Sequence, residues 1–295
     1  MNSFLFTLLA NVAYARYRFL PSGPLFLPKK LTDYKRPHLL LVTTAFNKPE
    51  LIDKQAELIS LNVKDQDYRY LVVDNSTDKA SRSAIKEVCQ KRGIDYIAVR
   101  GGIFLYLVNR FNRCSLSHAF SLNWVYYKII RKIKPEFFAF LDHDIFPITP
   151  TFVADLQPEE DYYGVIRRRG EQLQYWFLWP GWSVYRFSTI KRYHPDFNPG
   201  FVGGTYLDTG GANYKRIYSR YDFSKLRFTP RVFCKLKKDN SISFEEIYYV
   251  WGVEIVNNAW LHLINGSVYK GIGNKEKMVK ACLNNLPFFQ KLLDL

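Results

Sequence analysis

The most constraining feature of this chain is the alternation of apolar runs and helical stretches between residues 37 and 150. Segments with apolar residues at helical spacing separate the runs, an order typical of βαβ units. The sequence therefore predicts an α/β fold, Rossmann-like in its first half, with a mostly parallel central sheet flanked by helices. The predicted buried strands are residues 38–44, 68–73, 96–99 and 137–141.

Helix start and stop signals lie between these strands. Pro49 suits the first turn of a helix that extends to about residue 62, because the N–H that proline lacks has no partner there. Gly93 suits the end of a helix over residues 78–92, since glycine adopts the left-handed conformation without strain. A further helix is expected over residues 117–132.

Beyond residue 150 the character of the chain changes. Thr149 and Pro150 are typical of a helix start, and short aromatic strands and glycine-rich turns are expected after them. We expect residues 37–272 to form one compact domain. The divisions are an N-terminal arm (1–36), a first half (37–150), a second half (151–272) and a basic, apolar C-terminal tail (273–295).

An excess of basic residues favours anionic partners. Lys and Arg number 42 against 27 Asp and Glu, which gives a formal net charge of +15. The basic residues are dispersed and no nucleic-acid-binding motif accompanies them, so nucleic acid is not expected as a partner. The four cysteines have neither disulfide nor zinc spacing, which favours a reducing compartment and hence the cytoplasm.

Both ends of the chain mix apolar and basic residues. The apolar run at residues 3–15 is shorter than the roughly 18 residues that a membrane-spanning helix needs. Residues 16–30 combine rings with Arg and Lys, so the arm is expected either to touch an anionic membrane surface or to pack on the domain. The tail beyond residue 275 predicts either a peripheral membrane contact or an ordinary solvated helix.

Polar side chains follow three of the predicted strands. Because the carboxyl ends of parallel strands meet at one edge of a sheet, where α/β proteins bind ligands, these side chains are expected to share a site. Each alone is also what a turn or helix cap requires, so their joint order is the evidence. They are Thr43, Thr44 and Asn47 at the end of the first strand, Asp74 and Asn75 at the end of the second, and Asp142 and Asp144 at the end of the last.

The pair Asp142 and Asp144 has the chemistry of a divalent cation site. Two carboxylates two residues apart at a strand end can turn toward one ligand. Mg²⁺ and Mn²⁺ take oxygen ligands of this kind and share their coordination with phosphate groups. The alternative is a helix-capping aspartate beside a solvated one.

Three segments resemble the ordered motifs of family 2-like glycosyltransferases, which have the GT-A (nucleotide-diphospho-sugar transferase) fold. They are residues 41–47 (LVTTAFN), 71–78 (LVVDNSTD) and 138–144 (FAFLDHD). The resemblance covers roughly residues 37–150. It implies that this half binds the nucleotide-sugar donor, with Thr43, Thr44, Asn47, Asp74 and Asn75 near the nucleoside, Asp142 near the ribose and diphosphate, and Asp144 as direct metal ligand.

The second half is similar to the acceptor-binding half of such enzymes. Trp179 and Trp182, in an aromatic segment, are predicted to line the donor site, although core packing also explains such rings. His262 resembles the late histidine that completes the metal site, although a lone histidine in an apolar strand is commonly structural. His118, at a helix start, is a second candidate for donor contact.

A base is needed if the reaction inverts the anomeric carbon, because the acceptor hydroxyl must lose its proton. Asp208, in the glycine-rich stretch 203–211, is the first candidate, and Glu254 is its competitor. Either carboxylate could also belong to a turn or to the surface. Inversion itself is implied by the resemblance alone.

These patterns together predict a Mn²⁺- or Mg²⁺-dependent, inverting glycosyltransferase that moves a sugar from a nucleotide-diphosphate donor to a glycan or lipid-linked acceptor. One alternative, a sugar-phosphate nucleotidyltransferase, should have a glycine-rich basic loop after the first strand, and residues 43–49 contain no glycine. The other alternative is a non-enzymatic, basic protein that binds membranes or polyanions, in which the acidic pair is structural.

Overall fold

The computed structural model describes residues 36–99, 114–236, 242–244, 252–264 and 275–291, together with positions 8, 11, 12, 14, 15, 18 and 293. Its largest sheet has the strand order β3-β2-β1-β4-β7-β6. The first four strands are parallel, and β7 and β6 are antiparallel to their neighbours. The strands are β1 Leu39–Ala45, β2 Tyr68–Asp74, β3 Asp95–Ala98, β4 Phe137–Asp142, β6 Tyr162–Arg169 and β7 Tyr175–Arg186.

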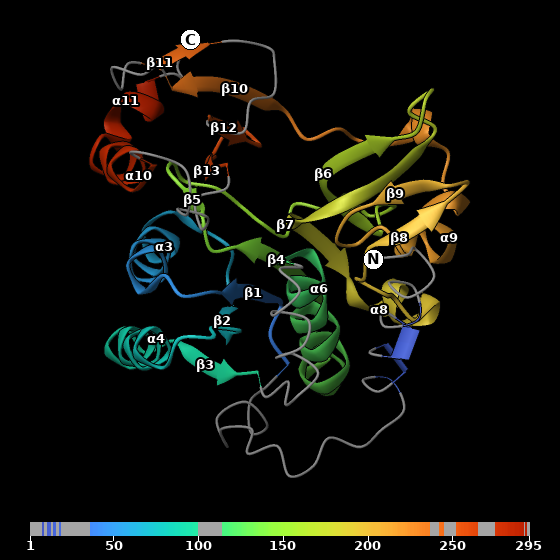
Figure 1. Cartoon of the computed structure of the whole chain (residues 1–295), viewed down its shortest axis with the longest axis horizontal. Helices are drawn as coiled ribbons and strands as arrows, with labels where there is room; N and C mark the ends of the chain where they lie inside the picture. The colour runs from blue at the N-terminus through green and yellow to red at the C-terminus, as the bar shows by residue number, and fades with distance from the viewer. Residues whose placement is uncertain are drawn as a thin grey trace.

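Helices cover both faces of the parallel strands, which explains why β1 is buried along its whole length. Leu39 and Leu41 pack against the side of α3 and α4, whereas Leu40 and Val42 face the core on the side of α6. Figure 1 shows α3 and α4 on one side of β1 and β2, with α6 on the other. The predicted α/β fold is confirmed. The helices are α3 Pro49–Asn62, α4 Lys79–Lys91 and α6 Cys114–Val125, which continues as the π-helix η1 Tyr126–Ile130 and α7 Arg131–Ile133.

The local helix signals have their expected effect. Pro49 lies in the first turn of α3. Asp78 caps α4, since its side chain accepts a hydrogen bond from the Ser81 N–H at 2.7 Å. Gly93 follows α4 with φ +67°, the left-handed conformation that favours glycine.

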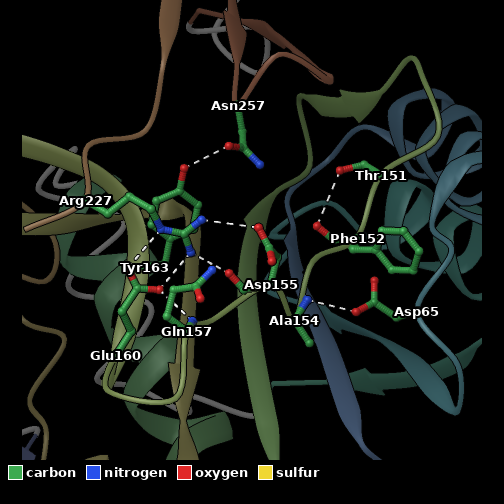
Figure 2. A network of polar contacts seen from close by, with 10 residues as sticks. All are labelled: Asp65, Thr151, Phe152, Ala154, Asp155, Gln157, Glu160, Tyr163, Arg227 and Asn257. Atoms are coloured by element: carbon green, nitrogen blue, oxygen red, sulfur yellow. Dashed lines mark hydrogen bonds and ion pairs between the residues drawn. The ribbon is translucent and has the colours of Figure 1, made fainter.

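The prediction that a helix starts at Thr149 and Pro150 is wrong. Thr151 instead forms a parallel bridge with Val63. The Asp65 carboxylate accepts hydrogen bonds from the N–H groups of Val153 and Ala154 at 2.7 and 2.8 Å, and Figure 2 shows the contact with Ala154. These long-range hydrogen bonds give the backbone N–H groups the partners that bonds within a helix would otherwise have supplied.

A second, antiparallel sheet begins directly after the acidic pair. Its order is β11-β10-β12-β13-β5, and β5 follows β4 after the two turn residues His143 and Asp144. The chain therefore passes from one sheet to the other between β4 and β5 (Figure 1), in the turn that contains Asp144. The strands are β5 Ile145–Pro147, β10 Arg231–Leu236, β11 Ile242–Phe244, β12 Val253–Val256 and β13 Trp260–Leu263.

The C-terminal helices α10 Lys275–Asn284 and α11 Leu286–Lys291 pack on this second sheet. Val279, Cys282 and Phe289 are buried in a cluster with Phe146 and Leu261. The apolar side of the tail is thus part of the core. Short elements complete the second half: α8 Phe187–Ile190, η2 Lys191–Tyr193, β8 Gly200–Val202, β9 Thr205–Leu207, α9 Asn213–Arg216, η3 Tyr218–Arg220 and η4 Phe223–Lys225.

The N-terminal arm contacts the domain at Tyr14. Its hydroxyl lies 3.0 Å from the Tyr127 hydroxyl and donates to the His194 carbonyl at 2.8 Å. The Arg216 guanidinium lies 4.6 Å from the centre of its ring. At this position the arm packs on the domain, whereas residues 19–30 lie outside the described residues. No helix within the described ranges has the length and apolar character needed to cross a membrane.

Candidate active site

The turn that carries Asp142 and Asp144 is held in place by hydrogen bonds from α3. The Gln55 amide donates to the carbonyl oxygens of Asp142 and Ile145 at 2.8 and 2.6 Å, and its own oxygen accepts from the Tyr70 hydroxyl at 2.7 Å. Gln55 is completely buried. Nothing in its sequence spacing distinguishes it from an ordinary helix residue, so sequence reasoning missed this support.

Asp142 is partly exposed and lies near a histidine. Its Oδ1 is 3.4 Å from Nε2 of His118, at the start of α6. The surrounding protein desolvates the carboxyl and raises its pKa, the neighbouring charge of Asp144 adds to this, and His118 opposes it. The structure thus brings together three residues that the sequence assigned to donor or metal binding.

Asp144 faces β13. The Leu263 N–H donates to the Asp144 carbonyl at 2.9 Å, and His262 Nε2 lies 3.8 Å from Asp144 Oδ1. Both side chains are almost completely buried. The predicted association of His262 with the acidic pair is therefore present, although 118 positions separate it from Asp144 along the chain.

Glu254 is not in a position to act as the predicted base. It has no exposed surface, and Arg231 donates to its Oε2 from Nε at 2.8 Å. Burial alone would raise its pKa, but the hydrogen bond and charge of His262, with the charges of Arg231 and Arg167, lower it to about 2. A carboxylate this buried and this acidic does not fit a base for an acceptor hydroxyl, so that candidate is corrected.

Of the two predicted tryptophans, Trp179 is the one whose ring contacts His262. Its ring centre lies 4.6 Å from that of His262, and the Arg167 guanidinium lies over the ring at 5.1 Å from its centre. An irregularity in the β6–β7 pairing brings Trp179 out of register. Gly181 is required here, because a Cβ at that position would lie 1.9 Å from the Trp179 ring.

Trp182 does not line the site. Its side chain is 1% exposed and packs against Tyr163 and Trp260 in the core. Side chains alternate along a strand, and the face on which Trp182 lies is covered. The prediction for Trp182 is therefore wrong, and core packing, its alternative, is correct.

The polar residues after β1 and β2 are bonded mainly to one another. Asn47, with φ +52°, accepts from the N–H groups of Thr77 and Asp78 at 3.1 Å each. The Asn75 amide donates to the Ser117 hydroxyl at 2.7 Å and so ties β2 to α6. These bonds bring the ends of β1 and β2 together at the start of α6.

Thr43 and Asp74 have no exposed surface, contrary to their predicted donor contact. The Asp74 carboxylate accepts from the Ser76 N–H at 2.8 Å and from the Tyr96 hydroxyl at 2.7 Å. In this arrangement neither residue reaches a ligand. Thr44 and Asn75 are almost as buried, and Asn47 is partly exposed.

Asp208 lies at the end of β9 and is exposed. Its Oδ1 accepts from the Thr209 N–H at 2.8 Å. A Cβ added at Gly210, where φ is +90°, would lie 3.0 Å from the Leu178 carbonyl oxygen. The Asp208 loop is therefore in close contact with the part of β7 that carries Trp179.

The side chains available as ligands for a cation are two carboxylates and one imidazole. Among the residues that the structure describes, no three His, Cys, Asp or Glu side chains are gathered closely enough to form a complete metal site. Asp142, Asp144 and His262 nevertheless suit Mn²⁺ by their chemistry, with phosphate oxygens as the further ligands. The residues fit a cation that binds together with its diphosphate.

No protein-family model matches the chain, and comparison with curated proteins gives no match. Among solved structures, the galactosyltransferase LgtC in complex with donor and acceptor sugar analogues has TM-score 0.38 and 16% identity, over 52% of this chain and 59% of that one. The mannosyltransferase PcManGT from Pyrobaculum calidifontis, in complex with GDP-Man and Mn²⁺, has TM-score 0.32 and 14% identity, over 64% and 55%. S. aureus TarS has TM-score 0.32 and 13% identity, over 54% and 30%.

The chain thus spans 59% and 55% of the first two proteins and 30% of the third. All three TM-scores are below 0.5, so we take the function from the residues of this chain rather than from these likenesses.

Proposed function

We propose that this protein is a metal-dependent glycosyltransferase that uses a nucleotide-diphosphate sugar. One observation carries the proposal: Asp142 and Asp144 lie at the carboxyl end of a parallel strand, and β13 brings His262 to within 3.8 Å of Asp144. Acidic pairs at this edge of an α/β sheet suit a cation bound to a diphosphate. The three ordered sequence motifs support the same function.

In this proposal Asp142, Asp144 and His262 hold Mn²⁺ or Mg²⁺. The cation neutralises the charge that develops on the departing nucleoside diphosphate. His118 lies beside Asp142 and is in a position to donate a hydrogen bond to a phosphate oxygen. Trp179 is partly exposed beside His262, and its ring is proposed to contact the sugar of the donor.

Asp208 is proposed as the base of an inverting transfer. Its exposure supports the role, because an acceptor hydroxyl can reach the carboxylate from solvent. The glycines around it allow a substrate to approach the backbone closely. The acceptor is proposed to be a glycan or a lipid-linked sugar.

A cytoplasmic location with contact to an anionic membrane surface remains a prediction. The apolar side of α10 is occupied in the core, and Lys277 and Lys280 lie on its exposed side. Basic side chains in this position favour anionic lipid. Sedimentation with anionic liposomes tests this: substitution of both lysines by glutamine, which leaves the buried side of α10 intact, is expected to weaken it, and an unaltered pellet would dismiss the contact.

Thermal unfolding with nucleotides tests the donor site. UDP, GDP and dTDP are each added with and without Mn²⁺, and one of them is expected to raise the Tm only when the metal is present. A ligand at a hundred times its Kd stabilises by about 2.7 kcal/mol, which such a measurement detects. Equal stabilisation by heparin or any other polyanion would favour the non-enzymatic alternative. A panel of nucleotide sugars, followed by metal-stimulated hydrolysis, then identifies the donor.

A further inference from the structure

A chain of polar contacts extends from the acidic pair into the second sheet. β12 and β13 are antiparallel neighbours, with Glu254 directly opposite His262. β10 pairs with β12 on its other side and contributes Arg231. The order of contacts is Arg231, Glu254, His262, Asp144, and strand pairing holds each of the first three on a rigid element.

The hydrogen-bonding capacity of Glu254 decides which nitrogen of His262 carries a proton. Glu254 Oε1 lies 2.7 Å from His262 Nδ1, while Oε2 accepts from Nε and Nη2 of Arg231 at 2.8 and 2.5 Å. An ionised carboxylate only accepts hydrogen bonds, so Nδ1 must be the donor. Nε2, the other nitrogen, is the one that lies toward Asp144.

The orientation of the ring is restricted on a further side. The Trp179 ring packs on the imidazole at 4.6 Å between centres, and His262 is only 4% exposed. Rotation of the imidazole would break the 2.7 Å bond to Glu254 and displace Trp179. The imidazole therefore presents one defined nitrogen to Asp144.

We propose that Glu254 is a positioning residue, which fixes His262 with its proton on Nδ1 so that Nε2 is available to a divalent cation shared with Asp144. Arg231 holds Glu254 in turn. The inference rests on the proposed function, because the cation is the one of the donor site. Carboxylate partners of this kind orient metal-binding histidines and raise their basicity.

A second arginine–glutamate pair, which is partly exposed, provides a control for loss of a carboxylate away from the site. The guanidinium of Arg227 donates to both oxygens of Glu160 at 2.9 and 2.8 Å and lies over the Tyr163 ring (Figure 2). No described contact joins Glu160 to His262, Asp142 or Asp144. Glu160→Gln therefore removes a carboxylate that is also paired with an arginine, in a more exposed position and without a described contact to the site.

Binding of Mn²⁺, measured by electron paramagnetic resonance first alone and then with the nucleoside diphosphate that raises the Tm, tests the proposal. Glu254→Gln is expected to weaken Mn²⁺ binding about 10- to 100-fold relative to the wild type. Glu160→Gln is expected to stay within about twofold of it. Affinity of Glu254→Gln within about twofold of wild type would overturn the role of Glu254.

Histidine nitrogen NMR provides a readout that needs neither metal nor a variant at Glu254. In the wild-type protein, Nδ1 of His262 is expected to carry a proton, with the resonance assigned by its loss in His262→Gln. A proton on Nε2 alone would contradict the proposal.

Failure of this inference is distinguishable from failure of the proposed function. If Asp144→Asn loses Mn²⁺ binding while Glu254→Gln keeps it, the positioning role alone is overturned. If the wild-type protein binds no Mn²⁺ even with nucleotide present, both fall together.

Discussion

The two sides of the candidate site are built in different ways. On the side of β1 and β2, polar residues at the strand ends bond to neighbours in adjacent loops, as Asn47 does with the Thr77 N–H. On the side of β13, His262 depends on Glu254 across a strand pair and on Asp144 in the turn between β4 and β5. The first side stabilises the fold at the strand ends, whereas the second supplies side chains suited to a cation.

Asp144→Asn should break the second side and have the largest effect. An amide carries no negative charge for a cation, so transfer is expected to fall by at least about a thousandfold. Donor turnover with Mn²⁺ measures this, and circular dichroism checks the fold. Turnover at the wild-type level would remove Asp144 from the metal site.

Asp208→Asn should affect the reaction more than donor binding. Loss of a general base typically lowers the rate about 10²- to 10⁴-fold, so kcat is expected to fall while the donor KM changes little. Steady-state kinetics separate the two constants. Retention of kcat would show that another group takes the proton.

Gln55→Leu should show how far the turn depends on α3. The substitution leaves two buried carbonyls and the Tyr70 hydroxyl without their partner, at about 1 to 3 kcal/mol for each unsatisfied group. A large loss of stability in urea unfolding is expected, together with lower activity. Asn62→Ala is the control, because Asn62 in the same helix donates only to the Pro147 carbonyl. If both variants lose activity equally, the turn has no special dependence on Gln55.

Gly181→Ala sharpens the comparison at Trp179. The added Cβ would lie 1.9 Å from the ring, which must leave its place beside His262. A stability loss of about 1 to 3 kcal/mol is expected from overpacking, with weaker donor binding. The double variant Gly181→Ala/Trp179→Ala should recover stability but not donor binding, since the ring that clashes is gone. A strictly additive result would contradict the contact.

The smallest effect concerns pH. Glu254 has a pKa lowered from 4.5 to about 2, so its stabilising contribution is complete above pH 4.5 and is lost as the pH falls toward 2. The difference in unfolding free energy between wild type and Glu254→Gln is expected to shrink over that range. Urea unfolding from pH 6 to pH 3 measures it, and a constant difference would argue against the ion pairs.

Local signals predicted the first half of the chain well. Apolar runs became the parallel strands within one or two residues, and Gly93 follows the end of α4 as expected. The same kind of signal failed at Pro150, where Asp65 and Val63, far away in sequence, determine the backbone. Propensity is a weak prior, and such tertiary bonds override it.

The second half of the site was only partly predictable. His262 and Trp179 were found by their residue type and motif order, but the same reasoning chose Trp182, which the core buries. Gln55 and Arg231 carry no sequence signal, because each acts on a group distant along the chain. Asp74 was predicted to contact the donor, but its buried carboxylate is already hydrogen-bonded within the protein.

The sequence by itself determined the α/β order, the strand ends and the acidic pair, because these depend on periodicity and on neighbours within a few residues. Only the tertiary structure decided that Glu254 faces His262, that His262 reaches Asp144, and that Trp179 rather than Trp182 contacts His262. The physical reason is strand pairing: register and face decide which distant side chains meet, and a shift of one residue would send each to the opposite side.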